Sequence, residues 1–171
     1  TIAAANDGFE ITGVAYDAKI MPLKVLSSYG SGNLSKAIRY AVDNGADVIN
    51  MSLGYPAKIN NYFDQNVGDS IKYAHDKGVV CVTAAGNGYQ GHLNKWDPLP
   101  NPSYPARWAT RVGMAVGGID KNNNLYKQGN RSGNTQLNYV NAPGVQVYSA
   151  KGNNGYQYLT GTSMAAPHVA G

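Results

Sequence analysis

The chain has 171 residues, of which 43% are hydrophobic and only 14% are charged, with a net charge of +4. This length suffices for one domain with a sizeable core, and no apolar run reaches the about 18 residues of a membrane-spanning helix. The basic residues are dispersed, which argues against nucleic-acid binding. A lone cysteine, Cys81, excludes an intrachain disulfide and a cysteine metal cluster. Few charges together with many Asn, Gly and Tyr residues favour a secreted protein.

The first half of the chain alternates between two kinds of apolar segment. Residues 18–26, 46–54 and 78–87 are short, rich in Val, Ile, Leu and Ala, and bounded by Gly or Asn, which predicts strands. Between them, residues 34–44 and 62–77 place apolar side chains at helical spacing, which predicts two helices. Strands that alternate with helices form parallel sheets through right-handed crossovers, so we expect an α/β fold.

The second half of the chain has a different character. Residues 112–120 and 138–150 have a strand pattern, whereas 88–106 and 121–137 are rich in Pro, Asn and Gly and predict loops. The sequence contains no internal repeat and no linker. We therefore expect residues 1–171 to form one domain, or most of one.

Two of the predicted strands end in residues suited to a binding site. Parallel sheets bind ligands at the carboxyl ends of their strands, which here read SLG (52–54) and AAGN (84–87). An amide held at such an edge, as Asn87 would be, can donate a hydrogen bond to a developing oxyanion. A turn formed by Gly86 and Asn87 explains the same residues equally well.

Ser163 stands in the run GTSMA, where a strand-like stretch gives way to a helix-compatible one. A serine at a helix start lies beside free N–H groups in the positive end of the helix dipole, which suits a nucleophile that attacks a carbonyl. Pro167 has no N–H, so the carbonyl of Ser163 loses its usual helical partner. An ordinary N-cap serine is the alternative reading.

His168 follows Ser163 by five residues, but the spacing does not make it the base for that serine. Five helical residues correspond to a rotation of about 500°, or about 140° net, so the two side chains face different directions. We expect His168 to be a half-buried histidine with its own hydrogen-bond partner. His75 and His92 come with no recognisable partner motif.

Three further features have competing interpretations. The run GSGNLS (30–35) lacks the third glycine of a dinucleotide fingerprint, and an edge segment that pairs with an extended peptide explains it as well. Asp7, followed by Gly8, can form a simple turn or contribute one carboxylate to a Ca²⁺ site. Cys81 has apolar neighbours in its strand, so we expect an unreactive core residue.

Four motifs in register extend over nearly the whole chain. The segments ITGVAYDAKIMPLKVL (11–26), VINMSLG (48–54), AAGN (84–87) and GTSMAAPHVAG (161–171) resemble the subtilisin-like serine proteases, the subtilases of peptidase family S8, in that family's order. The resemblance implies a three-layer α/β sandwich with a mainly parallel sheet.

The resemblance also implies roles for particular residues. It makes Ser163 the nucleophile and Asn87 the side-chain donor to the oxyanion. It also implies that two strands hold the bound peptide, one at Gly30, Ser31 and Gly32 and the other at Ser52, Leu53 and Gly54. One wall of the pocket for the residue before the scissile bond is implied at Ala84, Ala85 and Gly86. Structural Ca²⁺ is implied at the Asp7 carboxylate and the backbone oxygens of Ala5, Phe9 and Ile11, and the Tyr104–Pro105 bond is implied to be cis.

The Asp and His motifs of the subtilases do not occur in these residues. In the family both precede the position of Thr1, and Gly171 falls inside the serine helix. We therefore expect a partial catalytic domain, incomplete at both ends, of a secreted, monomeric serine endopeptidase that acts on polypeptides, with a pro-peptide as a candidate partner. We expect these residues alone to be inactive. The alternatives are a pseudoprotease or binding module of the same fold and, on GSGNLS alone, a nucleotide-binding protein.

Overall fold

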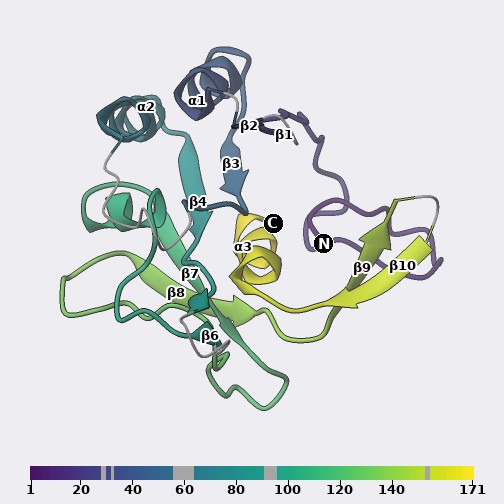
Figure 1. Cartoon of the computed structure of the whole chain (residues 1–171). Helices are drawn as coiled ribbons and strands as arrows, with labels where there is room; N and C mark the ends of the chain where they lie inside the picture. Colours follow the sequence, from purple (N-terminus) through teal and green to yellow (C-terminus); the bar gives the residue numbers. More distant parts are fainter. Residues whose placement is uncertain (28–29, 32, 56–63, 91–95, 153–154) are drawn as a thin grey trace.

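A computed structural model of the chain describes all residues except 28–29, 32, 56–63, 91–95 and 153–154 (Figure 1). Among the residues described, every helix is too short or too polar to cross a membrane.

Four parallel strands form the central sheet, in the order β3-β4-β7-β8 (Figure 1). They are β3 (Val48–Met51), β4 (Val80–Ala84), β7 (Met114–Ile119) and β8 (Tyr139–Pro143). The parallel sheet predicted from the alternating pattern is thus confirmed, and each of the four strands lies within a predicted one.

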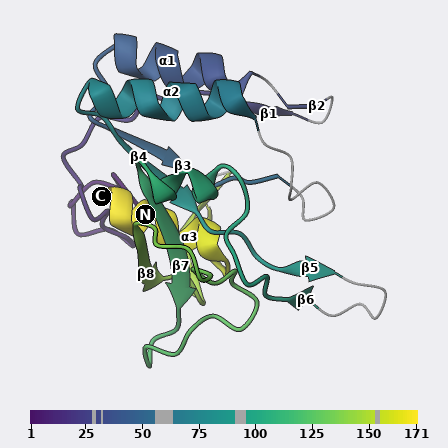
Figure 2. The same ribbon diagram turned by 90° about the vertical axis from the view of Figure 1, so that its left-hand side faces the viewer.

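Helices cover both faces of this sheet. Helices α1 (Leu34–Asp43) and α2 (Gln65–Asp76) lie side by side on one face, and α3 (Thr162–Ala170) lies on the other (Figure 2). Asn33 begins α1 by accepting a hydrogen bond from the Lys36 N–H (2.9 Å), as expected of an N-cap asparagine. The structure therefore has the three layers that the resemblance implied.

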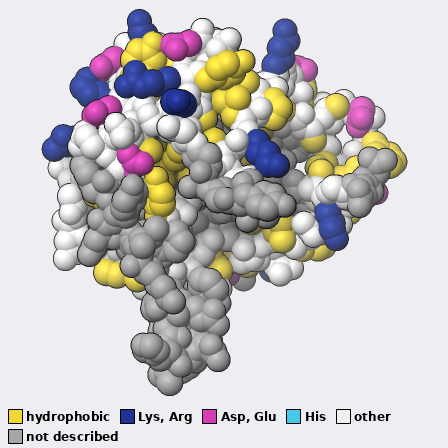
Figure 3. Space-filling model, turned by 45° about the horizontal axis from the view of Figure 1, so that its top comes forward, with side chains coloured by type: hydrophobic (Ala, Val, Ile, Leu, Met, Phe, Trp, Pro, Cys, Tyr) yellow, Lys and Arg dark blue, Asp and Glu magenta, His cyan; other side chains and the backbone are white. Residues whose placement is uncertain are grey.

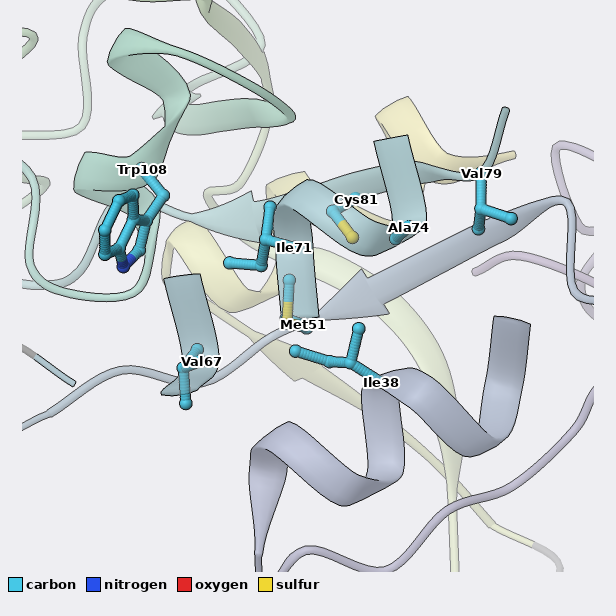
Figure 4. Packing of buried hydrophobic residues seen from close by; sticks show 8 residues of the cluster. All are labelled: Ile38, Met51, Val67, Ile71, Ala74, Val79, Cys81 and Trp108. Carbon is cyan, nitrogen blue, oxygen red and sulfur yellow. The ribbon is translucent and has the colours of Figure 1, made fainter. Parts of the chain in front are cut away.

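The alternation of side chains along β4 divides the core in two. Cys81 points towards α1 and α2, whereas Val82 and Ala84 point towards α3. Figure 4 shows the larger cluster, which consists of Ile38, Met51, Val67, Ile71, Ala74, Val79, Cys81 and Trp108. The smaller cluster, beneath α3, consists of Val82, Ala84, Val116, Ala142, Ala165 and Ala166. The small side chains of this second cluster allow α3 to pack closely on the sheet.

The outer face of the helical layer carries charges of both signs (Figure 3). Lys72 and Asp76 form an ion pair of 2.6 Å one turn apart on α2, with both side chains exposed. Arg39 lies over the Tyr73 ring, 4.9 Å from its centroid. These contacts describe a solvated surface, and exposed pairs of this kind contribute little to stability.

Three antiparallel pairs and a short 3₁₀ helix lie outside the central sheet. They are β1 (Leu26–Ser27) with β2 (Gly30–Ser31), β5 (Tyr89–Gln90) with β6 (Trp96–Asp97), β9 (Val147–Lys151) with β10 (Gly155–Leu159), and η2 (Ala106–Thr110). The predicted loop 88–106 thus contains β5, β6 and the start of η2.

The prediction of a strand over residues 18–26 is wrong for most of that segment. Only Leu26 lies in a strand, and it pairs with β2. Ile20 and Leu23 remain 59% and 37% exposed. A strand requires a hydrogen-bonded neighbour, and none of the described residues forms a ladder with 18–25. The adjacent edge of the sheet is also open, because β3 pairs with β4 alone among the described strands.

The predicted strand over residues 138–150 is two strands. The chain leaves the sheet after Pro143, and Gln146 adopts a left-handed backbone conformation (φ 54°). This turn directs β9 away from β7 and into its pairing with β10. A change of direction of this kind interrupts an apolar pattern that otherwise reads as continuous.

Cys81 allows a test of this core. Burial raises the pKa of its thiol to about 12, so the thiol is neutral and inaccessible in the folded protein, whereas an unfolded thiol ionises near pH 8.5. We predict that iodoacetamide at about pH 8.5 leaves Cys81 unmodified in the native protein and alkylates it fully in guanidinium chloride. Mass spectrometry of the two samples measures this. Rapid alkylation of the native protein would show that the packing around β4 is not as described.

Candidate active site

Ser163 lies in the first turn of α3, at the carboxyl end of β3. Gly161 is the N-cap of the helix and Ser163 is its second residue, half-buried. The Ser163 Oγ is 3.4 Å from the backbone oxygen of Ser52, which immediately follows β3. This contact is long for a hydroxyl bond, so the Oγ is not tightly held by it. The nucleophile candidate thus stands at the positive end of a helix dipole.

The Ser163 carbonyl oxygen, which Pro167 cannot bond, has a different partner. The Ser52 hydroxyl donates a hydrogen bond of 2.9 Å to it, and the Asn50 amide donates one of 3.0 Å to the Ser52 Oγ. Because Asn50 and Ser52 are two residues apart, both point to the α3 side of the sheet. The sequence predicts that the carbonyl loses its helical partner, but it does not reveal that Ser52 replaces that partner.

Asn87 lies beside this helix start, with its amide orientation fixed. Its Oδ1 accepts hydrogen bonds from the Thr162 backbone N–H (2.8 Å) and the Thr162 hydroxyl (2.9 Å). The backbone N–H can only donate and therefore needs an acceptor, so the oxygen of the amide must face α3. The Nδ2 group donates to no acceptor among the described residues. An amide donor is therefore available next to the start of α3.

Thr162 connects the two segments, a role that no pattern in the sequence indicates. The residue is fully buried, and its Oγ1 accepts a hydrogen bond of 3.1 Å from the Gly86 N–H while donating to Asn87. A threonine directly before the candidate serine is the only sequence signal for this role, and it is weak on its own.

Gly86 must be a glycine at this position. Its φ of +102° is unfavourable for other residues, and a Cβ there would lie 2.6 Å from the Asn130 Nδ2 and 2.8 Å from the Ser103 Oγ. The sequence interpretation of Gly86 and Asn87 as a turn is thus compatible with a binding role: the glycine allows the backbone to turn and thereby presents the Asn87 amide.

The predicted pocket wall consists mainly of backbone. Ala84 packs into the cluster beneath α3 and Ala85 is completely buried, so neither side chain faces a ligand. Gly86 is half-buried. If these residues line a pocket, they line it with backbone atoms around Gly86, and the assignment stays a prediction.

The two predicted peptide-binding segments are only partly defined. Ser52 is bonded to Ser163, Leu53 packs against the larger core cluster, and Gly54 is exposed. Gly30 and Ser31 form β2, which pairs with β1 along one edge. Gly32 lies outside the described residues. Beside these segments, the Tyr104–Pro105 peptide bond is cis, as the resemblance implied.

The proposed calcium loop is an exposed turn. The Asp7 Oδ1 accepts a hydrogen bond of 3.0 Å from the Phe9 N–H, and Gly8 has a φ of +78°. The donors implied at Ala5, Asp7, Phe9 and Ile11 are oxygens, which suit Ca²⁺, but they are fewer than the about six to eight that the ion takes. Among the described residues, no cluster of three or more acidic, His or Cys side chains could hold a metal. Further ligands would have to come from elsewhere.

His168 is engaged within its own helix. Its Nδ1 is 2.8 Å from the Met164 carbonyl oxygen, and because a carbonyl only accepts, the Nδ1 carries the proton. This contact agrees with the expectation that His168 has its own partner and is not the base for Ser163. His75 is exposed at the end of α2, and His92 lies outside the described residues.

Taken together, the site holds a hydroxyl, an amide donor and a helix N-terminus within one junction. Such a group can stabilise the oxyanion formed when a hydroxyl attacks a carbonyl. Within the described part of the chain, no His or carboxylate is hydrogen-bonded to Ser163. The arrangement therefore contains the nucleophile and oxyanion side of an acyl-transfer site without its general base.

Known proteins resemble this chain in sequence and in structure. The profile of the subtilase family (Peptidase_S8) matches residues 1–171. Subtilisin DY of Bacillus licheniformis is 40% identical and Subtilisin Savinase of Lederbergia lenta is 37% identical; each alignment covers 100% of this chain and 58% of the relative. The chain therefore spans little more than half the length of these relatives.

Solved structures share its fold. The prenylagaramide maturation protease PagA is 30% identical with a TM-score of 0.76, over 94% of this chain and 56% of that one. The patellamide maturation protease PatA has a TM-score of 0.83 at 24% identity, over 99% of this chain and 60% of that one, and supports the fold alone. With the family profile matched from end to end, the chain belongs to the subtilase family.

Proposed function

We propose that this chain carries the nucleophile and the oxyanion donor of a secreted serine endopeptidase that hydrolyses polypeptides. The observation that carries the proposal is the arrangement around Thr162: its N–H and hydroxyl bind the Asn87 Oδ1, and the free Nδ2 lies beside Gly161 at the start of the helix that carries Ser163. A protein that only bound peptides would need neither an oriented amide nor a serine at the helix start.

The proposed reaction uses these groups in sequence. The Ser163 Oγ attacks the scissile carbonyl and loses its proton to a general base, and the resulting oxyanion accepts hydrogen bonds from the Asn87 Nδ2 and the Ser163 N–H. Collapse expels the amine, which takes up the proton, and leaves an acyl-enzyme. Water then attacks the acyl carbonyl, releasing the new carboxyl product and restoring the Ser163 hydroxyl.

We place the general base and the carboxylate that orients it in a part of the protein outside these residues. The open edge of β3 and the unpaired segment 18–25 support this division, because both leave backbone groups that another strand can pair. Residues 1–171 alone are accordingly inactive. Secretion, a monomeric state, a pro-peptide and structural Ca²⁺ at the Asp7 loop belong to the same proposal.

Labelling of the active serine tests the proposed function. We predict that a fluorophosphonate probe modifies Ser163 in the complete protein, that the protein cleaves casein, and that Ser163→Ala abolishes both. Ser132→Ala, which removes an exposed hydroxyl on another loop, leaves both intact. A complete protein that neither reacts nor cleaves would instead be a pseudoprotease or binding module.

The Ser52 hydroxyl provides a second prediction. Ser52→Ala removes the donor to the Ser163 carbonyl and leaves an orphaned polar group in the first turn of α3. We predict that kcat of the complete protein falls about tenfold, corresponding to a lost hydrogen bond of about 1.4 kcal/mol, while the backbone of Ser52 still binds substrate. Kinetics normalised by active-site titration measure the change, with Ser132→Ala as the control. An unchanged kcat contradicts a positioning role for this hydroxyl.

A further inference from the structure

Asn130 is a buried amide that belongs to none of the motifs identified in the sequence. It lies in the long loop between β7 and β8 and is 1% exposed. A polar side chain at that depth is costly unless all of its hydrogen-bonding capacity is used. Its partners therefore indicate what the residue does.

The Asn130 side chain makes four hydrogen bonds, which use both of its donors and both acceptor positions. Its Oδ1 accepts from the N–H groups of Gly88 (2.9 Å) and Leu99 (3.0 Å). Its Nδ2 donates to the Ala85 carbonyl and the Ser103 hydroxyl, both at 3.1 Å. The amide is thus saturated, and its orientation is fixed by two N–H donors on one side and a carbonyl on the other.

The backbone of Asn130 joins the same network. Its N–H donates to the Gly86 carbonyl (2.9 Å), and its own carbonyl accepts from the Tyr139 hydroxyl (2.7 Å). Asn130 therefore bonds Ala85 and Gly86 on one side of Asn87, and Gly88 on the other. No other described residue contacts this segment through so many hydrogen bonds on both sides of Asn87.

We propose that Asn130 is a positioning residue for the oxyanion donor. By clamping the backbone before and after Asn87, it holds that amide at the start of α3, where Thr162 completes its orientation. Asn130 itself contacts neither Ser163 nor a substrate. The inference rests on the proposed protease function, because positioning an oxyanion donor matters only if Ser163 reacts.

The chemistry of the site requires asparagine. An aspartate presents acceptors to the Ala85 carbonyl, where a donor is needed, and an alanine leaves the Gly88 and Leu99 N–H groups without their partner. The Nδ2 also lies 2.6 Å from where a Cβ of Gly86 would be, so this amide leaves no room for a side chain at position 86. The glycine at 86 and the asparagine at 130 are thus complementary.

Kinetics of the complete protein separate positioning from simple stabilisation. We predict that Asn130→Ala lowers kcat about 10- to 100-fold with KM nearly unchanged, because a displaced donor loses much of its effect on the transition state. In an Asn87→Ala background the same substitution causes little further loss, since the donor that it positions is gone. We predict the same change in kcat and KM for Asn130→Asp, which leaves no cavity. This variant provides the kinetic test if Asn130→Ala does not fold.

Ser70→Ala is the matched control. Ser70 is also completely buried and bonded to Ser35, Arg39 and the Asn66 carbonyl, but it lies on α2, on the opposite face of the sheet. We predict a lower Tm with unchanged kcat for this variant. If Asn130→Ala and Asn130→Asp behave like Ser70→Ala, or if their effects add fully to that of Asn87→Ala, Asn130 is only structural and the inference is wrong.

Amide hydrogen exchange distinguishes failure of this inference from failure of the proposed function. We predict faster exchange of the Gly88 and Leu99 N–H groups in Asn130→Ala, which removes their acceptor, than in the parent protein, whether or not the protein cleaves peptides. If the parent protein has no activity but the variant shows this change in exchange, the proposed function is wrong, whereas the clamping of the backbone by Asn130 is supported. Unchanged exchange overturns the clamp itself.

Discussion

The contact on which the site depends is the pair of hydrogen bonds from Thr162 to the Asn87 Oδ1. One partner begins α3 and the other follows β4, so these bonds join a helix to a strand end 75 residues away in sequence. They satisfy an N–H of the first helical turn, which otherwise has no partner. They also set the direction of the amide nitrogen, which gives the junction its chemistry.

Two further contacts in this junction come from residues of different elements. Ser52, after β3, replaces the helical partner that Pro167 removes from Ser163, and Asn130 clamps the backbone on both sides of Asn87. Buried polar groups are costly when unpaired, so each bond here restricts the position of the next. The result is a rigid arrangement before any substrate arrives, which is the condition for stabilising a transition state.

Local patterns predicted much of this architecture. The strand at 78–87 and the helix beginning after Asn33 follow from side-chain periodicity and capping, which depend on neighbours in sequence. The prediction of a strand at residues 18–25 was wrong because a strand needs a neighbouring strand to pair with, and side-chain periodicity does not indicate whether one is present. Thr162 and Asn130 were missed for a related reason: their roles arise from contacts between distant segments, and the residue types alone are common. The functional roles of Ser163 and Asn87 came from the family resemblance and remain to be tested.

The most direct test of the account is a crystal structure of the complete protein with a peptidyl boronic acid. The account predicts a covalent bond from the Ser163 Oγ to boron, with one boronate oxygen within about 3 Å of the Asn87 Nδ2, while the Asn87 Oδ1 still accepts from Thr162. An inhibitor bonded elsewhere, or an Asn87 amide turned away from the boronate with its bonds to Thr162 broken, would contradict it.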